Sequence, residues 1–260
     1  MWNLLPGAAG TLLRGRGAWP AAGLAAVTYE APPPGTDPYP AYFPGLLGPL
    51  PLLYGLAQRA QLAYMLRPGF PYRVPGLIQQ ANEQRLLAPL DLAAPVTLHV
   101  AASPVETPGR HSVAFDVQLE QGGQGVATCR SLYLARRDAG APRHAGAAVE
   151  GLAGSTEAWD LAADEGRRYA AVSGDYNPVH LSPWLARLFG YERPLLHGMN
   201  AVARAAAAIE RTTGQPLAAL EAKFKRPILL PACVTLTLAQ ELGRFQVASG
   251  ETIHLVGRFS

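Results

Sequence analysis

The chain has 260 residues, of which 49% are hydrophobic, 16% are charged and 8% are aromatic. This length suits one large domain or two domains of about 100–150 residues, and the apolar share excludes extensive disorder, which is typical of polar, highly charged chains. The net charge is only +3, and neither a dense basic run nor a run of about 18 apolar residues is present. We therefore expect neither nucleic-acid binding nor a membrane-spanning helix.

The N-terminal segment has some features of a transit peptide. Residues 1–29 carry two arginines, and no acidic residue precedes Glu30. Glycine and proline interrupt its apolar stretch, and both arginines follow that stretch. We interpret the segment as an ordinary entry into a domain and expect a cytoplasmic protein. Cys129 and Cys233 lie in apolar, strand-like stretches without metal-ligand spacing, which favours two buried thiols over a single disulfide.

The first part of the chain predicts a loop, one long helix and several strands. Residues 32–51 are rich in proline and glycine, and apolar residues recur at helical spacing over residues 50–66 until Arg67-Pro68-Gly69 ends the helix. Alternating patterns predict strands over residues 96–100, 112–119 and 125–134. The last two strands are expected to form a hairpin around residues 121–124.

The second part of the chain repeats this order of elements. Residues 138–151 are rich in alanine and glycine without periodicity, which indicates a linker. A loop follows over residues 173–194, then a helix over about 197–212 and strands at 220–224, 233–240, 245–247 and 252–259. One helix against an antiparallel sheet, made twice, predicts an α+β fold with an N-terminal domain over residues 1–140 and a C-terminal domain over 151–260.

One segment combines turn-forming residues with an acid and a base. It reads Ser173-Gly174-Asp175-Tyr176-Asn177-Pro178-Val179-His180. Gly174 tolerates a left-handed backbone, and Pro178 disfavours the helical conformation for Asn177, so the chain must bend here. Asp175 and His180 can then converge, and such a pair suits proton transfer because histidine titrates near neutrality. Taken alone, the segment also fits a simple turn with a surface histidine.

A second segment, residues 195–199, opens the predicted C-terminal helix with His197, Gly198 and Met199. The first N–H groups of a helix lack intrahelical partners, and Gly198 lets an acyl oxygen approach the main chain closely. The segment is therefore a candidate oxyanion site. A plain helix start, with His197 near the N-cap, is the alternative.

Together, these segments resemble the MaoC-like dehydratases, the family that includes the (R)-specific enoyl-CoA hydratases. The pattern Gly-Asp-x-Asn-Pro-x-His followed by His-Gly-Met carries the resemblance, which covers roughly residues 155–260. It implies a double hotdog whose C-terminal half is catalytic and whose first half, which lacks the motif, shapes the acyl pocket. It also implies reversible hydration of trans-2-enoyl thioesters, or dehydration of (R)-3-hydroxyacyl thioesters, in fatty-acid or related acyl metabolism.

The resemblance also implies roles for the residues of the two segments. Asp175 and His180 would hold the catalytic water, Asn177 would hold the loop or the water network, and the Gly198 amide would polarise the thioester carbonyl. His197 is expected to bind the substrate. No metal ion or redox cofactor is expected, because a thioester already acidifies the proton on C2.

The thioester carrier implied by the resemblance is coenzyme A or an acyl-carrier protein. Residues 221–227 form the one short cationic cluster that holds both lysines of the chain. We therefore predict that Lys225 or Arg226 contacts the phosphates of the carrier, and a solvated strand edge is the alternative. A hotdog thioesterase and a non-catalytic acyl-carrier-binding subunit stay open as other functions, as do a monomer and a homodimer.

Overall fold

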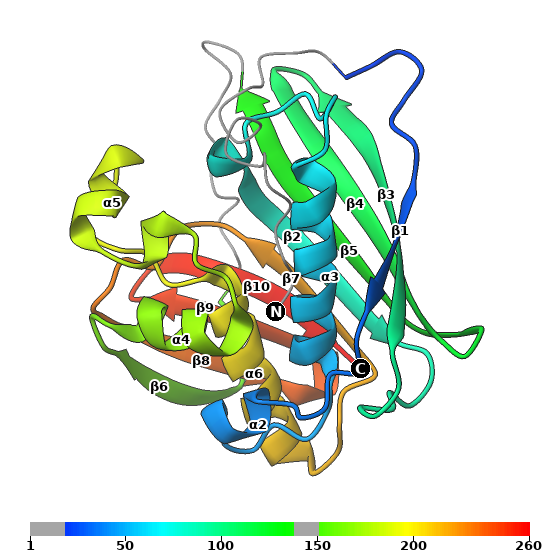
Figure 1. Cartoon of the computed structure of the whole chain (residues 1–260). Helices are drawn as coiled ribbons and strands as arrows, with labels where there is room; N and C mark the ends of the chain where they lie inside the picture. The colour runs from blue at the N-terminus through cyan, green and yellow to red at the C-terminus, as the bar shows by residue number, and fades with distance from the viewer. Residues whose placement is uncertain (1–18, 138–150) are drawn as a thin grey trace. The chain divides into compact units, whose positions relative to one another are not determined.

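The computed structural model describes residues 19–137 and 151–260 (Figure 1). The chain divides into two compact units, one of Met1–Thr36 with Leu53–Ala145 and one of Asp37–Leu52 with Gly146–Ser260. The linker predicted at residues 138–151 lies outside the described residues except for Gly151, as do residues 1–18 of the predicted domain entry. Sequence patterns did not indicate that Asp37–Leu52 belongs to the second unit.

The first unit is one long helix against an antiparallel sheet. Helix α3 (Leu50–Met65) runs along a sheet with the strand order β1-β3-β4-β5-β2 (Figure 1). The strands are β1 (Val27–Ala31), β2 (Ile78–Leu86), β3 (Val96–Thr107), β4 (Arg110–Gln121) and β5 (Gln124–Arg137). Gly122 and Gly123, both with positive φ, form the turn of the β4–β5 hairpin. The predicted helix and hairpin are thus confirmed.

The core of the first unit lies between α3 and its sheet. Ala57 and Ala60 of α3 are fully buried, as are Leu98 of β3 and Leu119 of β4. Small side chains on the helix let it approach the sheet, and each buried leucine stabilises the fold by about 1.5–3 kcal/mol. A short 3₁₀ helix, η1 (Val74–Gly76), precedes β2.

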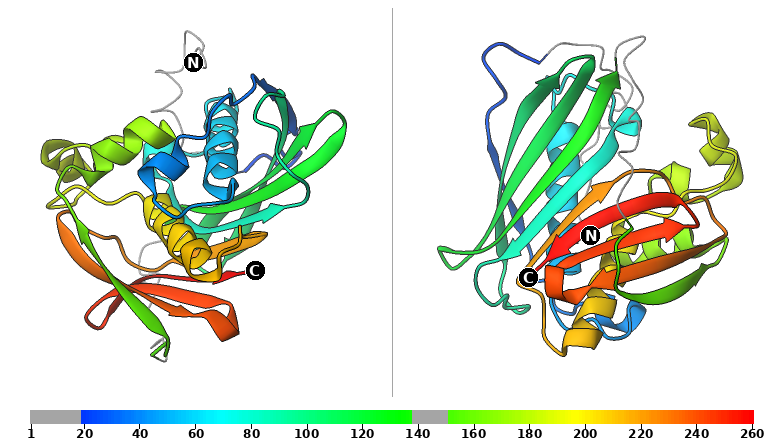
Figure 2. Two further views of the ribbon diagram at one scale, coloured as in Figure 1. Left: turned by 90° about the horizontal axis from the view of Figure 1, so that it is seen from below. Right: turned by 180° about the vertical axis from the view of Figure 1, so that it is seen from behind.

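The second unit repeats this arrangement around α6 (Gly198–Thr213), as the views of Figure 2 show. Its strands follow the order β7-β10-β9-β8-β6. They are β6 (Ser155–Leu161), β7 (Ala219–Phe224), β8 (Ala232–Ala239), β9 (Arg244–Ser249) and β10 (Thr252–Phe259), and the short helices are α2 (Tyr39–Tyr42), α4 (Glu165–Ser173), η2 (Pro178–His180), α5 (Pro183–Leu188) and η3 (Gln240–Leu242). Each unit packs antiparallel strands on one long helix, which confirms the predicted α+β class.

Two expectations about exposure and membranes can be compared with the structure. Cys129 is buried, but Cys233 is exposed, so the prediction of two buried thiols is wrong for Cys233. Side chains alternate between the two faces of a strand. In β8, Cys233 therefore lies on the exposed face, whereas the next residue, Val234, lies on the buried face. In the parts of the chain that the structure describes, no helix is long and apolar enough to cross a membrane.

Candidate active site

Helix α4 ends in a conformation that turns the chain into the acid–base segment. Gly174 caps the helix with a φ of 76°, in the left-handed region that favours glycine. The Ser173 hydroxyl then accepts a hydrogen bond from the Asp175 amide at 3.1 Å. Asp175 Oδ1 accepts from the Asn177 amide at 3.1 Å, and Asn177 Oδ1 accepts from the Val179 amide at 3.4 Å. These successive side-chain bonds fix the bend that the motif predicts.

The bend brings the predicted acid and base together. Asp175, His180 and His197 each offer a carboxylate oxygen or an imidazole nitrogen, and these atoms lie within 4.8 Å of one another. Groups of these types could hold a transition-metal ion, and they are equally suited to passing protons. The motif and its spacing favour acid–base chemistry for these groups, because they are those expected for a water-activating pair.

His180 is held as a neutral base. Its Nδ1–H donates to the Leu195 carbonyl at 2.9 Å, which leaves the Nε2 lone pair of the neutral ring to take a proton. Burial lowers the pKa of His180, and the nearby Asp175 carboxylate and the Leu195 hydrogen bond offset only part of that effect. The ring is therefore unprotonated at neutral pH.

His197 is a buried neighbour of this pair. Its side chain is 2% exposed, and its ring stacks on that of His180 with 3.7 Å between the ring centroids. Its Nε2–H donates to the main-chain carbonyl of Asp175 at 2.9 Å. Burial, and then the adjacent His180, lower the pKa of His197 to about 3. The predicted role of His197 in substrate binding stays a prediction, since its observed hydrogen bond is to the protein main chain.

Gly198 begins α6 directly after His197, which is the N-cap residue. A Cβ atom at Gly198 would lie 2.6 Å from Cε1 of Phe224, so the aromatic ring of β7 occupies the place of a side chain. The amide of Gly198 is in the first turn of the helix and has no intrahelical acceptor. The position thus combines an N–H group that lies outside the hydrogen bonds of the helix with close packing of the Phe224 ring.

The predicted carrier-binding residues lie at the end of β7. Lys225 and Arg226 follow Phe224 directly, and both side chains are exposed. Their amides both donate to the carbonyl of His254, at 2.8 Å and 3.3 Å. The cationic side chains therefore lie one and two residues from the ring that packs on Gly198. Contact with a carrier phosphate stays a prediction.

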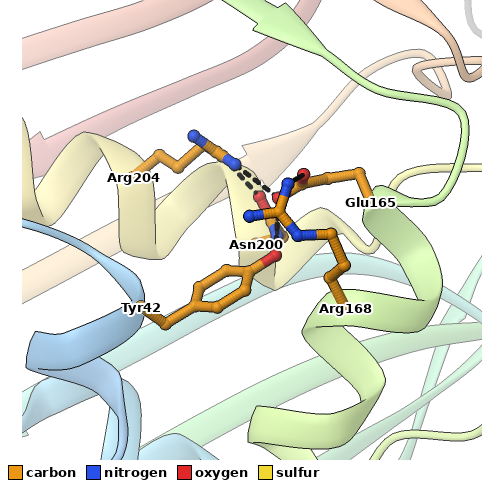
Figure 3. Close-up of polar contacts among 5 residues, drawn as sticks. All are labelled: Tyr42, Glu165, Arg168, Asn200 and Arg204. Atoms are coloured by element: carbon orange, nitrogen blue, oxygen red, sulfur yellow. Dashed lines mark hydrogen bonds and ion pairs between the residues drawn. The ribbon is translucent and has the colours of Figure 1, made fainter.

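A buried charged network beside the motif was not predicted (Figure 3). Glu165, the first residue of α4, is 1% exposed and accepts a hydrogen bond from the Tyr42 hydroxyl at 2.6 Å. Asn200 donates to it at 3.3 Å, Arg204 forms a short ion pair with it, and Arg168 lies at 3.3 Å. Burial alone would raise the pKa of Glu165, but the Tyr42 hydrogen bond and the Arg204 charge outweigh burial and lower it. Glu165 therefore stays ionised.

This network joins the acid–base segment to the start of α6. Asn200 lies in the first turn of α6, two residues after Gly198. Gly166 follows Glu165 on α4, and a Cβ at Gly166 would overlap the main-chain carbonyl of His180. The Glu165 carboxylate therefore ties the start of α6 to the helix that contacts the acid–base segment. No sequence signal identified Glu165, because the run Asp164-Glu165 with two following arginines is typical of a solvated helix face.

Residues 149–252 match the family described as the MaoC like domain. The C-terminal part of this chain is therefore similar to that family over about 100 residues. Its motif residues Asp175, His180 and Gly198 all lie within the matched segment. The resemblance inferred from the sequence is thus confirmed at the level of the family.

Two curated relatives match shorter segments. The 3-hydroxyacyl-thioester dehydratase X of Mycobacterium tuberculosis is 42% identical over 74 residues, which are 28% of this chain and 26% of that protein. The (R)-specific enoyl-CoA hydratase of Aeromonas caviae is 52% identical over 31 residues, 12% of this chain and 23% of that protein. The aligned segments thus span about a quarter of each relative.

Solved structures show that the likeness in fold extends over most of the chain. HtdX of Mycobacterium tuberculosis superposes with a TM-score of 0.74 at 23% identity and covers 91% of this chain and 99% of that one. A Mycobacterium tuberculosis protein described as having a double hotdog fold gives a TM-score of 0.52 at 12% identity, covering 87% of this chain and 86% of that one. The predicted double hotdog is confirmed.

Proposed function

We propose that this protein catalyses the reversible hydration of trans-2-enoyl thioesters, which is also the dehydration of (R)-3-hydroxyacyl thioesters. The observation that carries the proposal is the approach of Asp175 to His180 beside the start of α6, within a MaoC-like domain. The two curated relatives, a 3-hydroxyacyl-thioester dehydratase and an (R)-specific enoyl-CoA hydratase, support the same reaction. A hydro-lyase fits this set of groups because the reaction requires a proton acceptor, a proton donor and a site for enolate charge.

The proposed chemistry requires only groups of this chain and one water. Asp175 and His180 hold the water, and one of them takes a proton as the water oxygen bonds to C3 of the enoyl thioester. The electron pair of the C2–C3 double bond moves to C2 and onto the thioester oxygen, where the Gly198 amide stabilises the negative charge. The pair then returns a proton to C2, so water is added overall. We assign the two proton transfers to the pair as a unit, because coupled groups titrate together.

The supporting residues take specific parts in this scheme. Asn177 caps the turn at Val179 and so holds Asp175 and His180 in their relative positions. The Gly198 amide is the oxyanion donor, and loss of one such donor in other enzymes costs about 10²–10³ in rate. We also propose that neither a metal ion nor a redox cofactor takes part, since the thioester carbonyl provides the electron sink.

We further propose coenzyme A or an acyl-carrier protein as the carrier, with Lys225 and Arg226 contacting its phosphates. Both side chains are exposed and belong to the segment whose Phe224 ring packs on Gly198. Two adjacent cations suit a phosphate because ionised partners form the stronger hydrogen bonds. The cytoplasmic location and a homodimer stay predictions.

The test is a spectrophotometric hydration assay that follows the enoyl-thioester absorbance of crotonyl-CoA and of a longer enoyl-CoA. We expect Asp175→Asn and His180→Ala each to lower kcat by about 10² or more, as loss of a positioned acid or base does. His99→Ala is the matched control, because His99 lies in β3 of the first unit with a side chain that is 42% exposed. Protein treated with a chelator should keep its activity.

Three results would contradict the proposal. Wild-type protein that is folded but inactive on both enoyl-CoA substrates and on an enoyl-acyl-carrier protein would exclude hydration. Loss of the enoyl-thioester absorbance that is matched mole for mole by release of free thiol would instead indicate a thioesterase. Full activity of Asp175→Asn would remove the acid–base pair from the mechanism.

A further inference from the structure

His197 makes contacts to three parts of the proposed active site at once. Its Nε2–H donates to the main-chain carbonyl of Asp175 at 2.9 Å. Its ring stacks on the His180 ring, with centroids 3.7 Å apart and an angle of 27° between the planes. Its own main chain is the N-cap of α6 and leads directly into Gly198. One residue thus contacts the acid, the base and the proposed oxyanion donor.

Ordinary core packing does not account for this histidine. The Nδ1 atom of His197 is buried and has no hydrogen-bond partner among the described residues. A buried polar atom without a partner destabilises a fold, and an apolar ring would fill the same space without that cost. Tyr169 packs against the ring of His197, with 5.0 Å between the centroids, so the ring is held between Tyr169 and His180.

We propose that His197 is a positioning residue, which holds the main chain at Asp175 through Nε2 and sets the plane of the His180 ring by stacking. This role rests on the proposed function, since positioning matters for a reaction of the pair. The low pKa of His197, about 3, keeps its ring uncharged, so it neither repels a protonated His180 nor competes with it for the proton. We expect the loss of His197 to lower the reaction rate strongly, because a displacement of about 1 Å at an active site can cost about 10² in rate.

Among the described residues, ionisable groups contact or act on His180 from the loop and from the start of α6, whereas Arg167 and Glu165 of α4 bind other partners. Asp175 faces it from the loop and His197 from the start of α6. On α4, Arg167 donates to the Leu181 carbonyl, and Glu165 is paired with Arg204. A substitution of His197 should therefore change the pKa of His180 mainly by changing how deeply the His180 ring is buried, because burial is the largest cause of its lowered pKa.

Two substitutions separate the two contacts of the ring. His197→Phe keeps a flat ring on His180 and removes the Nε2–H donor. His197→Gln keeps an amide N–H that can reach the Asp175 carbonyl and removes the ring. We expect each variant to lower kcat by about 10-fold or more with KM changed less than about 3-fold, because positioning affects the bound complex. His99→Gln in the first unit is the matched control and should keep the wild-type kcat.

The pH dependence distinguishes positioning from general structural damage. His197→Gln should let water reach His180 and raise its pKa toward 6.5, so the acid limb of the kcat/KM profile should move to higher pH. His197→Phe should leave that limb in place. The same difference should be seen when the His180 ring is titrated by NMR, which does not depend on the substrate chosen. A circular-dichroism melt should confirm that each variant is folded.

The outcomes separate this inference from the proposed function. If wild-type protein is inactive in every hydration assay, the proposed function fails, and the NMR titration still decides whether position 197 controls His180. Wild-type kcat in both variants, or a His180 titration that is the same in wild type and His197→Gln, would overturn the positioning role. A rise in KM alone would instead assign His197 to substrate binding and so overturn it as well.

Discussion

Removing the charge of Glu165 should destabilise the second unit and slow catalysis. Its side chain is 2% exposed, while that of its partner Arg204 is 25% exposed. Loss of one partner of a buried ion pair typically costs about 3–5 kcal/mol. Arg204 keeps partial contact with water, and a glutamine oxygen can still accept from Tyr42. We therefore expect Glu165→Gln to lower the free energy of unfolding by about 2–3 kcal/mol and kcat by about 10-fold.

Urea unfolding followed by circular dichroism measures the change, and a second substitution tests the pair itself. Glu165→Gln combined with Arg204→Met should cost less than the sum of the single changes, by about 1–2 kcal/mol, because the two side chains interact directly. Arg211→Met is the matched control on the same helix, since its ion pair with Glu157 is about half exposed and should contribute under about 1 kcal/mol. A cost for Glu165→Gln within about 0.5 kcal/mol of the control would refute this reasoning.

The remaining predictions concern the oxyanion position, the binding of the carrier and the stability of the fold at low pH. Gly198→Ala should lower kcat by about 10², because the new Cβ would lie 2.6 Å from the Phe224 ring and displace the start of α6. A wild-type kcat in this variant would contradict the oxyanion assignment. Lys225→Glu with Arg226→Glu should raise KM for a CoA substrate by about 10-fold, or about 1.4 kcal/mol, and an unchanged KM would exclude the phosphate contact. The pKa of His197 falls from 6.5 to about 3 on folding, so its contribution to stability is complete above about pH 6.5 and is lost as the pH falls toward 3. Urea midpoints measured from about pH 7 to about pH 4 should therefore decrease, and less steeply in His197→Phe.

The features that could be predicted from the sequence depend on local rules. Gly174 and Pro178 restrict the backbone within a few residues, so the bend that brings Asp175 toward His180 follows from the motif. Helical spacing likewise indicated α3 and α6, and alternation indicated most strands of both sheets. These elements depend on periodicity, which does not require knowledge of the tertiary contacts.

The features that could not be predicted depend on contacts between distant residues. Tyr42 donates to Glu165 across 123 residues of sequence, and no local pattern connects a tyrosine in a proline-rich loop with a carboxylate on another helix. Charged residues at a helix start are usually solvated, so no pattern distinguishes Glu165 from an ordinary surface residue. His197 illustrates the same limit: its position near a helix start was expected, but its stacking on His180 follows only from the folded chain.

Main-chain packing helps to set the distance between the segment that holds Asp175 and His180 and the start of α6. Gly166 lets α4 contact the main chain of His180, and Gly198 lets the start of α6 contact the ring of Phe224. Neither contact leaves room for a Cβ atom, and the Glu165 carboxylate joins the two helices between these contacts. Substitutions at these sites should therefore move Asp175 and His180 relative to the Gly198 amide. Under the proposed function, their effects should fall on kcat more than on KM.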